Sequence, residues 1–485
     1  MKRIIVFLFL LSAILLSVPE GSSAQSINRS DALNAAGNYL KLRHPQQSAG
    51  MAEPIKSGND TLAWLIHCQP RGFVIIANTM NQPPIVAWSD EGNFSEGEAW
   101  ASFLPLVEKD LKLRMHYSTL QGDKASKNHE KWAFWMNPDK EKRLFEQWPP
   151  AGWSPTGGWL FTNWTQTAPY NALCPIDGQT QTRSVAGCPA TAMAQIVNFH
   201  QRTNETQFSD ADDYYHSFGA GNSYWIDNDW ESRGFPSWDK LNTLLDTLEA
   251  HFQNGVNLTN TDKATLTYAC GAAAKQVYSS SVSGTYGINQ AYDAFIRFGY
   301  SDAQLVYPSN PELNNMLMQN IKLGLPAQLG LVNPTVTAGH NVVVDGYNTD
   351  DLYHFNFGWG GSANGWYTMP PENIPYQLTV IEGIVLDINL SNVIIGADEK
   401  PAVQHKSSMF YSNETGTLHI SCPENPGQFL FTVVDNTGRI VMQHKLSTDS
   451  KFRTSGIPMT HLPKGIFIAT LKSENGFSSV CKFIR

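Results

Sequence analysis

The most informative stretch of the chain reads Ala186-Gly187-Cys188-Pro189-Ala190-Thr191-Ala192-Met193-Ala194-Gln195. Proline is favoured at the first position of a helix because its missing N–H group would have no partner there, so Pro189 predicts a helix that begins beside Cys188. The free N–H groups and the positive dipole end of such a helix stabilise an anion. Because the thiolate is the reactive form of cysteine, this setting predicts a nucleophilic Cys188, with Gly187 leaving room for a substrate backbone. The alternative is a buried structural cysteine.

A second stretch places a histidine at the head of a β-branched run that predicts a buried strand: Gly339-His340-Asn341-Val342-Val343-Val344. A turn-like segment and another strand-like run, residues 352–357, follow it. Two adjacent strands joined in this way would bring Asn356 or Trp359 close to His340, where either side chain could orient the imidazole. A lone histidine at a strand end is more often a satisfied surface or core group. A thiol and an imidazole in these two settings nevertheless predict nucleophilic acyl transfer, and therefore a cysteine peptidase.

Over roughly residues 150–390 the chain resembles the streptopain-like cysteine peptidases, a papain-like family of exported bacterial proteases. The matching pieces come in the family's order: residues 164–171 (Trp-Thr-Gln-Thr-Ala-Pro-Tyr-Asn), the Gly187-Cys188 helix, Gly339-His340, and residues 356–361 (Asn-Phe-Gly-Trp-Gly-Gly). The resemblance implies that Cys188 and His340 are the catalytic pair. It also implies that the side-chain amide of Gln166 and the N–H group of Cys188 form the oxyanion hole. Phe357 stands where the family has tryptophan, so an indole N–H is lost and the group that orients His340 is left open.

The resemblance also implies contacts with the substrate. The segment 278–284 aligns with a substrate-contacting loop of the family, which would place Ser283 or Gly284 on one side of a bound peptide and Gly339 on the other. A plain serine-rich loop is the alternative. The family further implies an endopeptidase of limited specificity that favours an apolar residue two positions before the cut.

The rest of the chain predicts an exported proenzyme. Lys2 and Arg3 precede an apolar run and a group of small residues, which is typical of a signal peptide, here residues 1–24. Residues 25–145 mix helix-like and strand-like runs and resemble the family's inhibitory propeptide, which would fill the cleft until it is cut away. We expect the charged stretch 128–143 to be an exposed connection where that cut falls.

The predicted fold class is α+β. Residues 146–395 form a papain-like catalytic domain of two subdomains, preceded by the α+β propeptide and followed by a small β-sandwich at 398–485. Short alternating runs with turn residues between them predict that sandwich. Its turns and its final residues resemble a C-terminal sorting domain of the type IX secretion pathway, which implies export to the outside or the cell surface of a Gram-negative bacterium, with the secretion machinery as a partner. A binding or purely structural sandwich is the alternative.

Composition narrows the remaining classes of function. The formal charge of −9, with no basic stripe, argues against nucleic-acid binding. No later segment is long and apolar enough to cross a membrane. Zinc-type spacings and a His-Glu-x-x-His motif are absent from the sequence, so we expect no metal and no cofactor. If Cys188 stays free, an odd number of the six cysteines is left for pairing; Cys422 and Cys481 could form a bridge, but the sequence does not fix the pairing.

The expected partners are protein or peptide substrates and the chain's own propeptide. Two other classes of function remain as alternatives. A transglutaminase-like acyltransferase would use the same order of Cys and His but would transfer the acyl group to an amine, so incorporation of a labelled amine separates it from hydrolysis. A catalytically inactive adhesin that keeps the fold for binding is the non-enzyme alternative, and the presence of Cys188, His340 and Gln166 disfavours it.

Overall fold

The computed structural model describes the chain in segments: 26–90, 107–116, 123–138, 144–332, 339–369, 381–389, 408–412, 417–421, 427–435, 440–448, 455–463, 466–473 and 478–485. The predicted signal peptide and Cys422 lie outside these residues, so the structure tests neither the signal peptide nor a Cys422–Cys481 bridge. None of the helices that can be described is long and apolar enough to span a bilayer.

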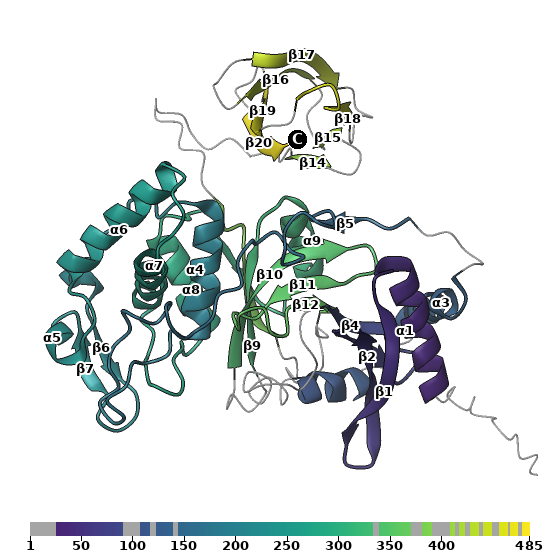
Figure 1. Ribbon diagram of the computed structural model, residues 1–485, viewed down its shortest axis with the longest axis horizontal. Helices are drawn as coiled ribbons and strands as arrows, with labels where there is room; N and C mark the ends of the chain where they lie inside the picture. The colour runs from purple at the N-terminus through teal and green to yellow at the C-terminus, as the bar shows by residue number, and fades with distance from the viewer. Residues whose placement is uncertain are drawn as a thin grey trace, which may run out of the picture.

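The N-terminal domain is an antiparallel meander with helices packed against it (Figure 1). Its elements are α1 (Arg29–Arg43), β1 (Ser48–Ser57), β2 (Asp60–Gln69), β3 (Phe73–Ala77), β4 (Ile85–Ser89) and α3 (Asp123–Met136). Helix α1 begins after Asn28, whose side chain accepts the N–H of Asp31, a standard N-cap bond. Its alanine-rich face is buried against the sheet, and α3 packs beside it.

Helix α3 corrects one sequence-based expectation. Residues 128–136 belong to this helix rather than to an exposed connection, and Trp132 and Trp135 are buried in the core. The alternation of charged residues with these tryptophans is therefore the pattern of an amphipathic helix. The remaining basic part of the stretch, 139–143, lies outside the described residues.

The central region continues the same sheet. Its strands are β5 (Gln147–Trp148), β8 (Gln304–Val306), β9 (Ala327–Val332), β10 (Gly339–Asn348), β11 (Tyr353–Asn356), β12 (Gly365–Tyr367) and β13 (Ile381–Leu386). The order is β1-β2-β3-β4-β12-β11-β10-β9-β13-β8, with β5 on β10. Strand β4 pairs with β12 through Trp88–Trp366 and Ala87–Tyr367, so the N-terminal domain extends the central sheet by four strands.

A helical lobe lies beside the sheet and has its own hydrophobic core (Figure 1). It contains α4 (Cys188–His200), the hairpin of β6 (Tyr214–Ser217) and β7 (Ser223–Ile226), α5 (Trp230–Arg233), α6 (Trp238–Gln253), α7 (Asn260–Ala273) and α8 (Ile288–Arg297). Helix α9 (Leu313–Lys322) packs on the sheet instead. Helix α4 contacts both α7 and β10, so it joins the two halves. The predicted two-subdomain α+β architecture is confirmed.

The C-terminal region is the predicted small β-sandwich. One sheet has the order β14 (Ser408–Ser412), β15 (Thr417–Ser421), β18 (Ser455–Pro458); the other has the order β17 (Ile440–Thr448), β16 (Gly427–Asp435), β19 (Ile466–Ser473), β20 (Ser478–Ile484). Alternate residues of β15, β16 and β19 point inward and form one core, which explains the period-two pattern of the sequence.

Candidate active site

Cys188 is the first residue of α4, as Pro189 predicts, and Gly187 is the residue that precedes the helix. Gly187 has a φ of +86°, and a Cβ there would lie 2.6 Å from Oε1 of Gln276, so the position requires glycine. Gln276 is buried and donates from Nε2 to the carbonyl of Ala186 at 2.7 Å. A buried amide therefore fixes the backbone just before the thiol.

Strand β10 brings His340 to the same place. The Sγ of Cys188 accepts a hydrogen bond from the backbone N–H of Asn341 at 3.4 Å. The Nε2 of His340 lies 2.9 Å from the carbonyl oxygen of Phe357, and because a carbonyl only accepts, Nε2 carries the hydrogen and Nδ1 is the nitrogen that takes up a proton. The imidazole also stacks on Trp359, with ring centroids 4.5 Å apart.

Burial sets the protonation of both groups. It raises the pKa of the Cys188 thiol to about 11, although backbone N–H groups that point at the sulfur offset part of the effect. It lowers the pKa of His340 to about 4, against the opposing effect of the hydrogen bond to Phe357. At neutral pH, thiol and imidazole are therefore both uncharged in this structure.

Backbone hydrogen bonds place two further segments beside the start of α4. The N–H of Ala186 donates to the carbonyl of Gln166 at 2.8 Å, so the half-buried Gln166 lies alongside the residues that precede Cys188. The N–H of Val185 donates to the carbonyl of Ser279 at 3.0 Å, which brings the serine-rich loop to the same end of the helix.

The three residues that the resemblance places beside the substrate differ in how accessible they are. The Oγ of Ser283 is buried and bonds within its own loop, where it accepts the N–H of Ser279 at 3.1 Å. Gly284 pairs with Val277 through two 2.9 Å bonds, and a Cβ added to it would meet nothing within 4 Å. Gly339 is exposed at the start of β10, directly before His340.

Asn356 and Trp359 occupy different positions relative to His340. Asn356 lies opposite Val343 in the β10–β11 ladder, and its buried side chain donates to the carbonyl of Thr162 at 2.8 Å and accepts from Gln195 at 3.2 Å. The hydrogen bonds of Asn356 thus fix the segment before Gln166, whereas Trp359 is the side chain that contacts the imidazole.

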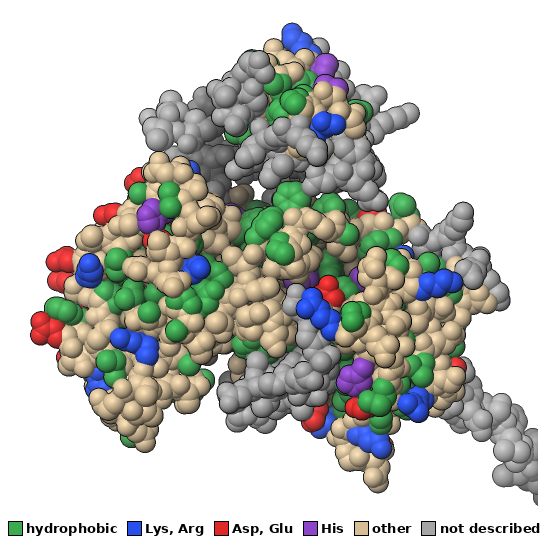
Figure 2. All heavy atoms as spheres, in the orientation of Figure 1, with side chains coloured by type: hydrophobic (Ala, Val, Ile, Leu, Met, Phe, Trp, Pro, Cys, Tyr) green, Lys and Arg blue, Asp and Glu red, His purple; other side chains and the backbone are tan. Residues whose placement is uncertain are grey.

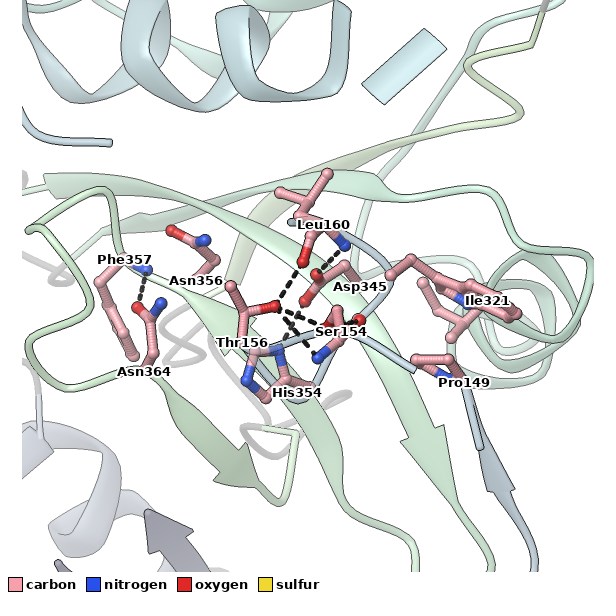
Figure 3. A network of polar contacts seen from close by, with 12 residues as sticks. Pro149, Ser154, Thr156, Leu160, Ile321, Asp345, His354, Asn356, Phe357 and Asn364 are labelled. Carbon is pink, nitrogen blue, oxygen red and sulfur yellow. Dashed lines mark hydrogen bonds and ion pairs between the residues drawn. The ribbon is translucent and has the colours of Figure 1, made fainter. Parts of the chain in front are cut away.

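A second polar network lies deeper in the sheet (Figure 3). The Nδ1 of His354 on β11 is 2.6 Å from Oδ1 of Asp345 on β10, and both side chains are buried. The other oxygen of Asp345 accepts the N–H of Leu160 at 2.8 Å, and a Cβ on Gly158 would collide with this carboxylate. The pair therefore holds residues 158–160 against the sheet.

The N-terminal domain reaches the site through its edge strand. The hydroxyl of Ser89 in β4 donates to the carbonyl of Asn364. The Oδ1 of Asn364 accepts the N–H of Phe357 at 2.9 Å, the residue whose carbonyl bonds His340 (Figure 3). A chain of contacts thus links the N-terminal domain to the imidazole.

Sequence reasoning missed several of these groups. Gln276 and the N–H of Asn341 have no motif of their own, because each contacts a residue far away in the chain. The Asp345–His354 pair forms across two consecutive strands and was not singled out. Gly187 was predicted to leave room for a substrate backbone, but the neighbour that its missing Cβ admits in the structure is the side chain of Gln276. Among the residues that can be described, no group of His, Cys, Asp and Glu side chains is arranged to hold a metal ion.

Three family models match separate parts of this chain. Residues 164–367 match the model of the peptidase C10 family, residues 24–112 that of the Spi protease inhibitor, and residues 413–485 that of the secretion system C-terminal sorting domain. Streptopain of Streptococcus pyogenes is 23% identical over 324 residues, which cover 62% of this chain and 72% of streptopain.

Two further relatives match less of the chain or less closely. The thiol protease/hemagglutinin PrtT of Porphyromonas gingivalis is 25% identical over 208 residues, 42% of this chain and 22% of PrtT. A solved fragment of Prevotella intermedia prointerpain A covers 70% of this chain and 98% of its own, with 20% identity and a TM-score of 0.47. The chain therefore carries a peptidase C10 domain, with a Spi protease inhibitor domain before it and a secretion system C-terminal sorting domain after it.

Proposed function

We propose that the chain is a secreted cysteine endopeptidase, made as an inactive proenzyme, in which Cys188 and His340 hydrolyse peptide bonds in protein substrates. The observation that carries the proposal is the hydrogen bond between the Cys188 sulfur and the backbone N–H of Asn341. It brings the start of α4 together with the strand end that carries the histidine. A thiol at a helix start next to an imidazole is the arrangement that nucleophilic acyl transfer needs.

The reaction follows from these positions. Once the propeptide leaves, Nδ1 of His340 takes the thiol proton, and the helix dipole and N–H groups of α4 stabilise the resulting thiolate. The sulfur attacks the substrate carbonyl, while the side-chain amide of Gln166 and the N–H of Cys188 stabilise the oxyanion. His340 protonates the departing amine, and water then hydrolyses the thioester with His340 as the base.

We assign the orientation of His340 to two groups. The carbonyl of Phe357 fixes the tautomer by accepting from Nε2, and the ring of Trp359 fixes the plane of the imidazole. Asn356 is assigned a supporting role, because its hydrogen bonds go to the segment before Gln166. Ser283, Gly284 and Gly339 are proposed as contacts for the substrate backbone; the open space above Gly284 and the exposure of Gly339 support this for those two.

The inactive state is proposed to depend on strand addition. Pairing of β4 with β12 holds the N-terminal domain on the peptidase sheet, and Arg114 donates from one nitrogen to the carbonyls of Thr368 and Met369 at 3.0 and 2.9 Å. While the domain is bound, thiol and imidazole stay uncharged, with the pKa of Cys188 raised to about 11 and the pKa of His340 lowered to about 4. Release of the domain opens the site to water and to substrate, which allows the charged pair to form.

For the outer segments we propose removal of residues 1–24 on export, a propeptide at 25–145, a peptidase domain at 146–395 and a sorting domain at 398–485 that is read by the type IX secretion machinery. The match of residues 413–485 to the sorting-domain family supports this route to the outside or the surface of a Gram-negative cell.

The test compares the wild-type proenzyme with Cys188→Ala under reducing conditions near neutral pH, by intact mass and by casein hydrolysis. The proposal expects only the wild type to shed its first domain and to cleave casein. Equal behaviour of the two proteins would assign any cleavage to another residue. Incorporation of a labelled amine in place of hydrolysis would identify an acyltransferase instead.

A further inference from the structure

The β6–β7 hairpin of the helical lobe carries an aromatic pair on its outer face. Tyr215 and Trp225 are directly opposite each other in the ladder, with ring centroids 5.4 Å apart, and they are 55% and 47% exposed. Trp230, in the short helix that follows, is 41% exposed. Exposed apolar patches are typical of sites that bind a protein or another ligand.

The inner face of the hairpin is firmly held. The Nδ1 of the buried His216 lies 2.9 Å from the carbonyl of Asn222, and its Nε2 lies 2.6 Å from the N–H of Tyr278, so one neutral tautomer satisfies both bonds. The hydroxyl of Tyr214 donates to the carbonyl of Gln276 at 2.8 Å. Gln276 is also the residue that packs against Gly187, so the hairpin and the start of α4 belong to one rigid lobe.

Negative charge is concentrated around the aromatic pair. Residues 209–240 contain seven acidic and two basic side chains, a formal charge of −5 out of −9 for the whole chain. Pairing of Tyr214 with Ile226 places Asp213 and Asp227 side by side at one end of the ladder. Figure 2 shows carboxylates next to hydrophobic side chains at the left edge of the molecule, over α5 and the start of α6.

Few of these carboxylates are neutralised by the cations around them. Asp212 forms an ion pair with Arg297 at 2.8 Å, and the guanidinium of Arg233 lies over Tyr224. The carboxylate of Asp213 accepts from the neutral indole of Trp238 at 2.7 Å, and that of Asp229 accepts the backbone N–H of Trp225 at 2.6 Å. Hydrogen bonds to neutral donors leave the negative charge of both groups in place.

We propose that this aromatic–acidic face, formed by Tyr215, Trp225 and Trp230 with Asp213, Asp227, Asp229 and Glu231, is an exosite that binds lysine- and arginine-rich segments of protein substrates. The substrate role rests on the proposed function; the binding of basic segments does not. Lys and Arg side chains suit this surface, because their stems pack on aromatic rings while their charged ends approach ring faces and carboxylates. The two rings are inclined by 58°, so they present separate faces to separate side chains rather than one flat platform for a sugar.

The first test measures binding without catalysis. Full-length Cys188→Ala proenzyme is titrated against fluorescein-labelled decalysine, with a neutral Gly-Ser peptide as the control probe. We expect decalysine to bind and the neutral peptide not to bind. Raising the salt from about 20 to about 300 mM should weaken binding about tenfold or more, because exposed charges are screened.

Three variants of this Cys188→Ala protein locate the site. Tyr215→Ser with Trp225→Ser, and separately Asp229→Asn with Glu231→Gln, should each weaken binding about tenfold. Tyr307→Ser, an exposed aromatic outside the hairpin, should leave it unchanged. Unchanged binding in both double variants, or binding of chitotetraose in place of decalysine, would overturn the proposal.

The second test uses the processed wild-type enzyme and one peptide substrate with or without a decalysine tail. The exosite predicts a lower KM for the tailed peptide, with kcat unchanged, and loss of this difference in the Tyr215→Ser/Trp225→Ser enzyme. Equal KM values would refute the substrate role. Because the first test uses an inactive protein, failure of the proposed catalytic pair would leave the binding result intact.

Discussion

Gly365→Ala should weaken binding of the N-terminal inhibitor domain without lowering the activity of the processed peptidase. Gly365 is the first residue of β12. A Cβ at this position would lie 2.5 Å from the carbonyl oxygen of Trp88 and 2.7 Å from the Cβ of Ser89. Both neighbours belong to β4 of the N-terminal domain. Once that domain has left, nothing of it remains for the new methyl group to meet.

The expected loss of binding free energy follows from the hydrogen bonds that must break. Moving β4 away disturbs the two ladder pairs with β12, the 2.8 Å bond from Thr368 N–H to the Val86 carbonyl, and the contact between the Ser89 hydroxyl and Asn364. At about 0.5–1.5 kcal/mol for each net hydrogen bond, these four contacts amount to about 2–6 kcal/mol, or about 30- to 20,000-fold in the inhibition constant.

The assay titrates processed wild-type and Gly365→Ala enzymes with a separately produced fragment of residues 25–145, using hydrolysis of a short fluorogenic peptide as readout. Hydrolysis without the fragment should be alike in the two enzymes. A fragment with Gly37→Ala is the matched control, because a Cβ at this helical position meets nothing within 4 Å. An unchanged inhibition constant for the Gly365→Ala enzyme would refute the claim that strand addition holds the inhibitor.

Other parts of the structure give further predictions. Arg114→Ala in the fragment removes two charge-assisted hydrogen bonds to the peptidase domain. It should weaken binding of the fragment to the enzyme by about 2–4 kcal/mol in the same titration. His354→Ala leaves the buried carboxylate of Asp345 unpaired and should cost about 3–5 kcal/mol in urea unfolding of both proenzyme and processed enzyme; a loss below 1 kcal/mol would contradict the buried-pair argument. Because burial lowers the pKa of His340 to about 4, the fold disfavours its protonated form, so proenzyme stability should be fully present above pH 6.5 and fall by up to about 3 kcal/mol between pH 6.5 and 4. His340→Asn should reduce this loss of stability at acid pH in the same unfolding series. An identical pH profile for the variant would contradict the assignment of the loss to His340.

Local chemistry made part of the site predictable. Pro189 specifies a helix start, and the run after His340 specifies a buried strand, because each signal depends on a few neighbouring residues. The strands of the C-terminal sandwich were predictable for the same reason, since their inward residues alternate along each run.

Long-range pairing was not predictable. Strand β4 finds β12 across more than 270 residues of chain, and no local pattern specifies the partner of an edge strand. Asn356 illustrates the same limit: neighbouring strands do bring it near β10, but its side chain is engaged by Thr162 and Gln195 from other segments. The α3 region was misjudged because its charged residues conceal two buried tryptophans at helical spacing.

The most direct test of the account is site-resolved alkylation of Cys188 by iodoacetamide near neutral pH, before and after removal of the N-terminal domain. With the pKa of the thiol near 11, the account predicts slow labelling of Cys188 in the intact proenzyme. It predicts labelling at least about tenfold faster in the processed enzyme, with the gain abolished by His340→Ala. Equal rates in the two forms, or preferential labelling of Cys68, Cys174 or Cys270, would contradict it.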